Sequence, residues 1–443
     1  MTHIIKKTAL HVMLIFAATA AIAQTGIPRI VINSMGHSAK INNLLFTPDG
    51  SQIISVSEDK TVRVWNTATG EMKNKFESQI GDGWEGILYA SDLSSDGKLL
   101  AISGYPVATE KENYVVIIDL AKGIQVATAV GGSPDVINAL GFINEGKYLV
   151  GGGDDKMIKI WSVSNTSTLS VAATISVGAP VKFFAINPVT KDVAVAAEGK
   201  TEILIYNLSG IEKGSVKSTP RVLKRHRGEI NKIAYSADGT YMASSSFDAN
   251  EFFVWKADGS FVKDIPVTTD INAIAFSADA KILVGLDIKG KGASYSMPLG
   301  NKFADFSGHD NTVFSAAISP LSESGNFIVA SAGGTNNEIY LWNPINGRTV
   351  KKIKGKGSVV GDLSFGNGME LYISRVLDAK PDFKTSFDFL NFNINRNPAK
   401  LQPGKNLSGS ISQTSPFDLD LGKGKLIQND PSEDGRILQG NRF

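Results

Sequence analysis

Histidine and cysteine usage limits the chemistry that this chain of 443 residues can perform. The chain has no cysteine and five histidines, of which His3 and His11 fall in an apolar N-terminal segment. The other three, His37, His226 and His309, stand at one recurring place in a sequence repeat. Zinc sites and Ser–His or Cys–His nucleophilic pairs need histidine or cysteine that is free for chemistry. We therefore expect no catalytic residue, no metal ion and no cofactor, so the chain is predicted not to be an enzyme.

The repeat consists of strand-like apolar runs joined by polar turns. Eight units begin at intervals of 41 to 49 residues, near Ile41, Ile87, Val136, Val181, Ile230, Ile271, Val313 and Val359. The turn after the first run reads Asp-Gly in three units, at Asp49-Gly50, Asp96-Gly97 and Asp238-Gly239. Glycine supplies the positive φ that a tight hairpin turn requires. Each unit is therefore predicted to open with a β-hairpin.

Two units also share four polar residues at nearly equal spacing. These are His37, Ser55, Asp59 and Trp65 in the first unit, and His226, Ser244, Asp248 and Trp255 in the fifth. Together with Gly-His at Gly36-His37 and Gly308-His309, the pattern resembles the WD-repeat β-propeller family, over about residues 28–394. The resemblance implies that each set of four forms a buried hydrogen-bonded chain within one blade. Such a chain must satisfy all its donors and acceptors.

The resemblance also implies an all-β fold of four-stranded blades arranged in a ring. We expect a propeller over residues 24–394 with eight blades, and seven blades is the alternative. The eighth unit would take its fourth strand from Ile27–Ile32. Residues 395–443 do not follow the repeat and are predicted to be an irregular C-terminal extension.

Residues near the start of each first strand are the candidate binding residues. Asparagine follows isoleucine there in four units, at Asn42, Asn138, Asn231 and Asn272. A ring of amides could read a peptide backbone, although asparagine also suits local backbone bonding at such places. Trp84 stands apart from the other four tryptophans, in a glycine-rich loop before the second unit. Exposed tryptophan is a frequent anchor of protein interfaces, so Trp84 is the stronger candidate.

The N-terminus and the charge balance bear on location and partners. Residues 1–23 have a basic start at Lys6 and Lys7, an apolar run, and small residues at Ala21 and Ala23, which is typical of a signal peptide. These two lysines account for the net charge of +2, so the remainder is balanced. A nucleic-acid binder needs a basic face. We therefore expect an exported bacterial-type protein, periplasmic or secreted, with no membrane span after cleavage and no nucleic-acid partner.

The leading functional hypothesis is a non-catalytic scaffold that binds a partner protein through one propeller face. One alternative is a propeller enzyme, a metal-assisted hydrolase, for which Asp135, Glu229 and Asp270 are the acids placed to gather near the strand starts. Another is an accessory subunit of an envelope or secretion assembly. Fold alone does not choose between these functions.

Overall fold

A computed structural model describes residues 36–354, except 79–82, 108–114, 130–134, 164–167, 215 and 321–326, together with four strands farther along the chain. The chain divides into two compact units, and each is treated by itself. One unit is formed within Asn33–Gly357, and the other contains the strands that follow Ser358. The predicted signal peptide, residues 1–23, and the predicted closing strand, Ile27–Ile32, lie outside the described residues.

The described part of the first unit consists of seven blades, each built from four antiparallel strands that are consecutive in the chain. Blade 1 comprises β1 (Ile41–Phe46), β2 (Gln52–Ser57), β3 (Thr61–Asn66) and β4 (Met72–Glu77). Blade 2 comprises β5 (Leu88–Leu93), β6 (Leu99–Gly104), β7 (Val116–Asp119) and β8 (Ile124–Ala129). Blade 3 comprises β9 (Ile137–Ile143), β10 (Tyr148–Gly153), β11 (Met157–Ser162) and β12 (Thr168–Ser176). Blade 4 comprises β13 (Val181–Ile186), β14 (Asp192–Ala197), β15 (Glu202–Asn207) and β16 (Arg221–Lys224). Blade 5 comprises β17 (Ile230–Tyr235), β18 (Tyr241–Ser246), β19 (Glu251–Lys256) and β20 (Phe261–Asp264). Blade 6 comprises β21 (Ile271–Phe276), β22 (Ile282–Asp287), β23 (Lys291–Ser296) and β24 (Asn301–Ser307). Blade 7 comprises β25 (Val313–Ile318), β26 (Val329–Gly333), β27 (Glu338–Trp342) and β28 (Thr349–Ile353). A short 3-10 helix, η1 (Ile211–Lys213), follows β15.

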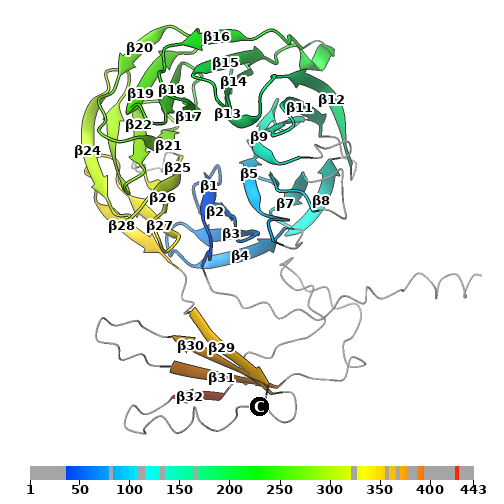
Figure 1. Ribbon diagram of the computed structural model, residues 1–443, viewed down its shortest axis with the longest axis vertical. Helices are drawn as coiled ribbons and strands as arrows, with labels where there is room; N and C mark the ends of the chain where they lie inside the picture. Colours follow the sequence, from blue (N-terminus) through cyan, green and yellow to red (C-terminus); the bar gives the residue numbers. More distant parts are fainter. Residues whose placement is uncertain are drawn as a thin grey trace, which may run out of the picture. The chain divides into compact units, whose positions relative to one another are not determined.

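The ring closes with seven blades, so the expectation of eight is corrected to its alternative. The innermost strands β1, β5, β9, β13, β17, β21 and β25 follow one another around the ring (Figure 1). Strand β25 of blade 7 contacts β1 of blade 1 directly, which leaves no place between them for another blade. The propeller therefore ends with β28 at Ile353, well before the predicted limit of residue 394.

The four described strands of blade 7 are all consecutive in the chain. The outer place of this blade is taken by β28, which directly follows β27 in the chain. The seam between blades 7 and 1 is instead held by apolar packing in which Trp65 and Ile41 meet Leu341 and Ile353. The Ser315 hydroxyl on β25 also donates to the backbone oxygen of Ile41 at 3.1 Å. Closure thus depends on side chains at the seam.

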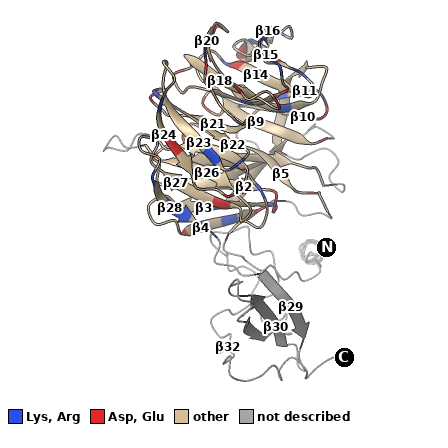
Figure 2. Ribbon diagram, turned by 60° about the vertical axis from the view of Figure 1, so that its left-hand side comes forward, with Lys and Arg blue, Asp and Glu red and all other residues tan. Residues whose placement is uncertain are grey.

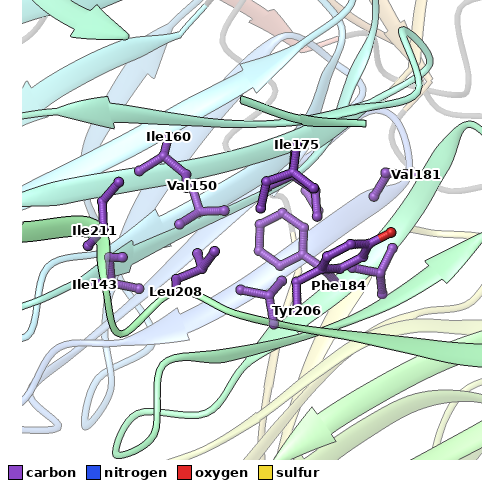
Figure 3. Close-up of a cluster of buried hydrophobic side chains, with 13 residues drawn as sticks. Ile143, Val150, Ile160, Ile175, Val181, Phe184, Tyr206, Leu208 and Ile211 are labelled. Carbon is purple, nitrogen blue, oxygen red and sulfur yellow. The ribbon is translucent and has the colours of Figure 1, made fainter. Parts of the chain in front are cut away.

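Packing between neighbouring blades forms the core in a series of clusters around the ring. Figure 3 shows the cluster between blades 3 and 4, where Val150 and Ile160 of one blade face Phe184 and Tyr206 of the next. Blades 2 and 3 are joined more directly, because the long strand β12 pairs in parallel with β8 at Thr168–Thr128 and Leu169–Ala129. The two blades therefore share one eight-stranded sheet.

Every innermost strand carries the same irregularity. A β-bulge falls at the second residue of this strand in all seven blades. On β1, Ile41 pairs with Ser57 and Asn43 pairs with Val56, so that Asn42 between them has no partner residue on β2. A bulge leaves a residue unpaired and re-aims its side chain. All four predicted asparagines, and also Tyr89, Lys182 and Phe314, occupy this bulge position.

The second unit contains one four-stranded sheet, with strands in the order β29 (Val359–Phe365), β30 (Glu370–Val376), β31 (Phe387–Asn393) and β32 (Lys425–Gln428). The eighth sequence unit thus supplies three strands of a sheet that is separate from the ring. The fourth strand is β32, which pairs with β31 at Leu390–Leu426, and it takes the place predicted for Ile27–Ile32. Among residues 395–443, the structure describes β32 alone.

Candidate functional site

The four polar residues of blade 1 form one hydrogen-bonded chain. Trp65 donates from Nε1 to the Ser55 hydroxyl at 2.8 Å, and Ser55 Oγ lies 2.6 Å from His37 Nε2. His37 Nδ1 lies 2.9 Å from Asp59 Oδ2. Because the Asp59 carboxylate can only accept, His37 donates from Nδ1 and accepts the serine proton at Nε2. The chain ties the segment before β1 to β2 and β3.

The chain in blade 5 uses a different acid from the one predicted. Trp255 donates to the Ser244 hydroxyl at 2.8 Å, and Ser244 Oγ lies 2.7 Å from His226 Nε2. His226 Nδ1 meets Glu251 Oε2 at 3.0 Å, so Glu251 replaces the predicted Asp248. The turn before β19 is one residue longer than the turn before β3, and it carries Asp248 away from the histidine. The backbone N–H of Asp248 binds Asp270 Oδ2 at 2.8 Å instead.

Blade 7 contains an incomplete chain. His309 Nε2 lies 2.9 Å from Ser331 Oγ, but His309 Nδ1 and Trp342 Nε1 have no hydrogen-bond partner among the described residues. Glu338 stands at the start of β27, the same place as Glu251 on β19, and pairs with Lys352 at 2.5 Å. Lys352 thus engages Glu338, whose counterpart in blade 5, Glu251, completes the chain there. Among the described side chains, the buried histidine keeps Ser331 as its hydrogen-bond partner, and burial lowers its pKa to about 4.

The acids of the two complete chains are held in their charged form. Burial would raise the pKa of Asp59, but hydrogen bonds from His37 and Thr61 outweigh it and lower that pKa. Burial opposes ionisation of Glu251 as well, yet hydrogen bonds led by those from Arg227 lower its pKa to about 2. Burial lowers the pKa of His226 despite the neighbouring carboxylate, so the imidazole is neutral. These residues are satisfied structural groups rather than reactive ones.

The asparagines at the bulges join neighbouring blades. Each side-chain amide donates to the backbone oxygen of the first residue in the next innermost strand. The four bonds are Asn42 to Leu88 at 2.8 Å, Asn138 to Val181 at 3.0 Å, Asn231 to Ile271 at 2.8 Å and Asn272 to Val313 at 2.7 Å. With the Ser315–Ile41 bond, five of the seven blade junctions are linked in this manner. The amides are therefore engaged in the architecture of the ring.

Trp84 lies on the face at which the innermost strands begin, and its residue is 66% exposed. Its loop is fixed to the loop after β6, because Tyr105 N donates to Ile87 O at 2.8 Å and Gly86 N donates to Tyr105 O at 3.1 Å. Tyr105 is 36% exposed at the same edge of blade 2. The bulge residue Tyr89 lies nearby on β5. Burial, then the charge of Glu58 and then Tyr105 raise the pKa of Tyr89. We call Trp84, Tyr89 and Tyr105 the aromatic edge.

Two of the three acids considered for metal binding, Asp270 and Asp135, are engaged in loop structure, and the third, Glu229, precedes β17. Asp270 accepts backbone N–H groups from Asp248 at 2.8 Å and Asn250 at 3.1 Å, and Asp135 accepts from Val136 at 2.9 Å. Within the described residues, no group of three or more His, Cys, Asp or Glu side chains is placed to hold a metal ion. The same residues include no helix that is long and apolar enough to cross a membrane.

The sequence did not point to Glu251 or Tyr89, and it marked Tyr105 only as the first residue of a long insert in the second unit, without a binding role. Glu251 and Glu338 both lie four positions before their tryptophans, and this shared spacing was a usable signal. Tyr89 could be found by its place in the strand, which matches that of the four asparagines. Tyr105 gave no comparable signal, because its exposure depends on the loop that follows β6.

Comparison with known families matches four stretches of this chain. The profile of the WD domain, G-beta repeat family covers residues 29–66, 124–162, 217–250 and 300–343. The last three stretches each begin at the outer strand of one blade or a few residues before it, and continue into the next blade. A similar curated protein is the periodic tryptophan protein 2 homolog of Dictyostelium discoideum, which is 22% identical over 226 residues.

That similarity covers 49% of this chain and 22% of the relative, so the chain spans about a fifth of the length of the relative. The overlap supports the repeat and says nothing of what this chain binds. WD40-repeat proteins are in general non-catalytic and bind other proteins. Four stretches of this chain are thus similar to the WD domain, G-beta repeat, and they lie in a closed ring of four-stranded sheets, which is the architecture of a β-propeller.

Proposed function

We propose that this chain is a non-catalytic scaffold that binds a partner protein through the face bearing the aromatic edge. The observation that carries the proposal is the exposure of Trp84, 66%, on a loop fastened by backbone hydrogen bonds to the Tyr105 loop. Tryptophan and tyrosine dominate the binding energy of many protein interfaces. A rigid loop also loses little conformational entropy when it binds.

The polar groups near this face favour a scaffold over an enzyme. His37, His226 and their acids are buried and hydrogen-bonded, and the asparagine amides hold blades together. Figure 2 shows acidic and basic residues interspersed over the propeller, which suits a protein partner better than nucleic acid. An accessory role in an envelope assembly is the second form of the same proposal, in which the partner is permanent.

Export is part of the proposal and is supported by the basic, apolar and small-residue pattern of residues 1–23. Its test is the N-terminal sequence of the protein recovered from its native source. Cleavage after Ala23, giving a chain that starts at Gln24, is expected. A recovered chain that retains Lys6 and Lys7 would refute export by this route.

The binding proposal is tested by affinity capture of the tagged chain from its native source after mild crosslinking, read by mass spectrometry. We expect one or two proteins in fixed ratio, and we expect Trp84→Ala to lose them while retaining its unfolding midpoint. The matched control is Val189→Ala, because Val189 is 63% exposed in the turn between β13 and β14, at the opposite end of the innermost strands. Equal loss in both variants, or in neither, would reject the aromatic edge as the binding surface.

A further inference from the structure

A cavity lies in blade 4, at the end of the blade where its innermost strand finishes. Its volume is about 340 Å³, and six residues line it: Asp192, Ile205, Asn207, Lys217, Thr219 and Arg221. Asp192 begins β14, Asn207 ends β15 and Arg221 begins β16, and these three strands are neighbours in one sheet (Figure 1). The cavity falls within the usual size of pockets that bind small molecules.

The connection between β15 and β16 supplies Lys217 and Thr219. Leu208 and Ile211 fasten this connection, because both are buried in the cluster between blades 3 and 4. Among the described residues, the side chains of Lys217 and Thr219 have no hydrogen-bond or ion-pair partner. Both groups can therefore bind a ligand without giving up a contact within the protein.

The other polar residues of the cavity hold one another in place. Asn207 Nδ2 donates to Asp192 Oδ1 at 2.6 Å, and Asp192 Oδ2 lies 3.5 Å from Arg221 Nη2. Arg221 also donates from Nη1 to the backbone oxygen of Asp258 at 2.6 Å and from Nη2 to that of Ala257 at 2.9 Å. A guanidinium group has five N–H donors, so these contacts leave two of them for a ligand.

A buried hydroxyl group from the next blade also lacks a partner. Tyr235, the last residue of β17, packs against the apolar cluster that contains Ile205. Its hydroxyl oxygen is buried and has no hydrogen-bond partner among the described residues. Burial and then the charge of Asp192 raise the pKa of Tyr235, whereas Arg221 lowers it. A buried polar group without a partner is unusual in a folded protein and indicates a place for a water molecule or a ligand.

The lining restricts the chemistry of the ligand. Ile205 is the one apolar residue among the six, so the ligand must be polar. Lys217 and Arg221 carry two positive charges against the one negative charge of Asp192, which favours a ligand with a single negative charge. An aspartate carboxylate can only accept hydrogen bonds, so the ligand must also bring hydroxyl donors. A simple carboxylate meets the first of these two conditions but not the second.

We propose that this cavity binds a sugar acid. The carboxylate of the sugar acid is held by Lys217 and Arg221, and its ring hydroxyls bond to Asp192, Asn207 and Thr219. The shared chemistry fits either a free sugar acid or an acidic sugar residue within a glycan. The cavity lies at the opposite end of the innermost strands from the aromatic edge, so it does not depend on the proposed partner protein.

The test is calorimetric titration of the purified chain at low ionic strength. The probes are D-glucuronate and D-galacturonate, together with their neutral counterparts D-glucose and D-galactose. The variant Lys217→Met removes one charge from the cavity and keeps an apolar side chain of similar length. The control is Lys200→Met, since Lys200 is exposed in the turn between β14 and β15, at the other end of the same blade.

We expect at least one sugar acid to bind the wild-type chain at least about tenfold more tightly than its neutral counterpart. Its affinity should fall at least about tenfold in Lys217→Met and should not change in Lys200→Met. Equal binding of the methyl glycoside of that acid would identify a glycan residue as the ligand, and loss of binding would identify the free acid. The proposal is overturned if neither acid binds the wild type, if the neutral sugars bind as tightly as the acids, or if the two variants bind equally.

Discussion

Glu251 Oε2 lies 3.0 Å from Nδ1 of His226, although 25 positions separate the two residues in the sequence. In blade 1 the corresponding acid, Asp59, comes from the turn between β2 and β3 and lies 2.9 Å from His37. In blade 5 the acid comes from the first residue of β19. Asp59 lies six positions before Trp65, whereas Glu251 lies four positions before Trp255, so the longer glutamate side chain reaches the same imidazole nitrogen from two positions later in the blade.

Glu251→Ala is therefore expected to lower the free energy of unfolding by about 1–3 kcal/mol, because it removes the partner of buried His226. Asp248→Asn is the control, since asparagine accepts the positive φ of 56° at this position. Chemical denaturation followed by tryptophan fluorescence measures both. A larger loss in Asp248→Asn than in Glu251→Ala would contradict the assignment of Glu251.

The amide of Asn272 links blades 6 and 7 through the backbone oxygen of Val313 at 2.7 Å. Asn272→Leu leaves that oxygen without its donor, and we expect a loss of about 1–3 kcal/mol in the free energy of unfolding. Asn301→Ala serves as the control, because Asn301 is exposed on β24 of blade 6. Equal stability of the two variants would show that the amide bridge contributes nothing to the ring.

Asp92 gives the fold a defined pH dependence. Burial raises its pKa from 3.8 to about 6, so the folded chain binds more protons than the unfolded chain between these values. The contribution of Asp92 to stability is therefore present at low pH and is lost as the pH rises through this window. Asp92→Asn retains an acceptor for the N–H of Phe142, and we expect it to be more stable than the wild type at pH 7.5.

Asp96→Asn, in the same blade, is expected to change the stability in the opposite direction to Asp92→Asn. Hydrogen bonds led by that from Ser94 lower the pKa of Asp96 to about 2, so its ionised form favours the folded state. This exposed variant should lose stability relative to the wild type above pH 4, while Asp92→Asn gains it. Unfolding midpoints measured from pH 4 to pH 8 test both directions, and a shared sign would contradict the assignment for Asp92.

The sequence predicts the repeat well and the closure of the ring poorly. The Asp-Gly turns and the spacing of His37, Ser55 and Trp65 depend on contacts within one blade, so they appear as local patterns. The number of blades depends on the direct contact between β25 and β1, and that contact leaves no period in the sequence. Val359–Phe365 continues the repeat, yet it forms a sheet in a separate unit.

The candidate site was predictable in the same uneven way. Trp84 was found because it breaks the pattern of the other tryptophans, whereas Tyr105 joins it through hydrogen bonds between two loops. The roles of the asparagines could not be read from one unit, because Asn231 binds the backbone of Ile271 in the next blade.

A partner protein that binds the face bearing Trp84 must come within a few ångströms of that side chain. Site-specific photocrosslinking tests this contact most directly, with p-benzoylphenylalanine placed at position 84 in one variant and at position 189 in another. We expect a crosslink to one protein from position 84 and none from position 189, on the opposite face. A crosslink to that protein from position 189 alone would contradict the claim, and so would equal crosslinking from both positions.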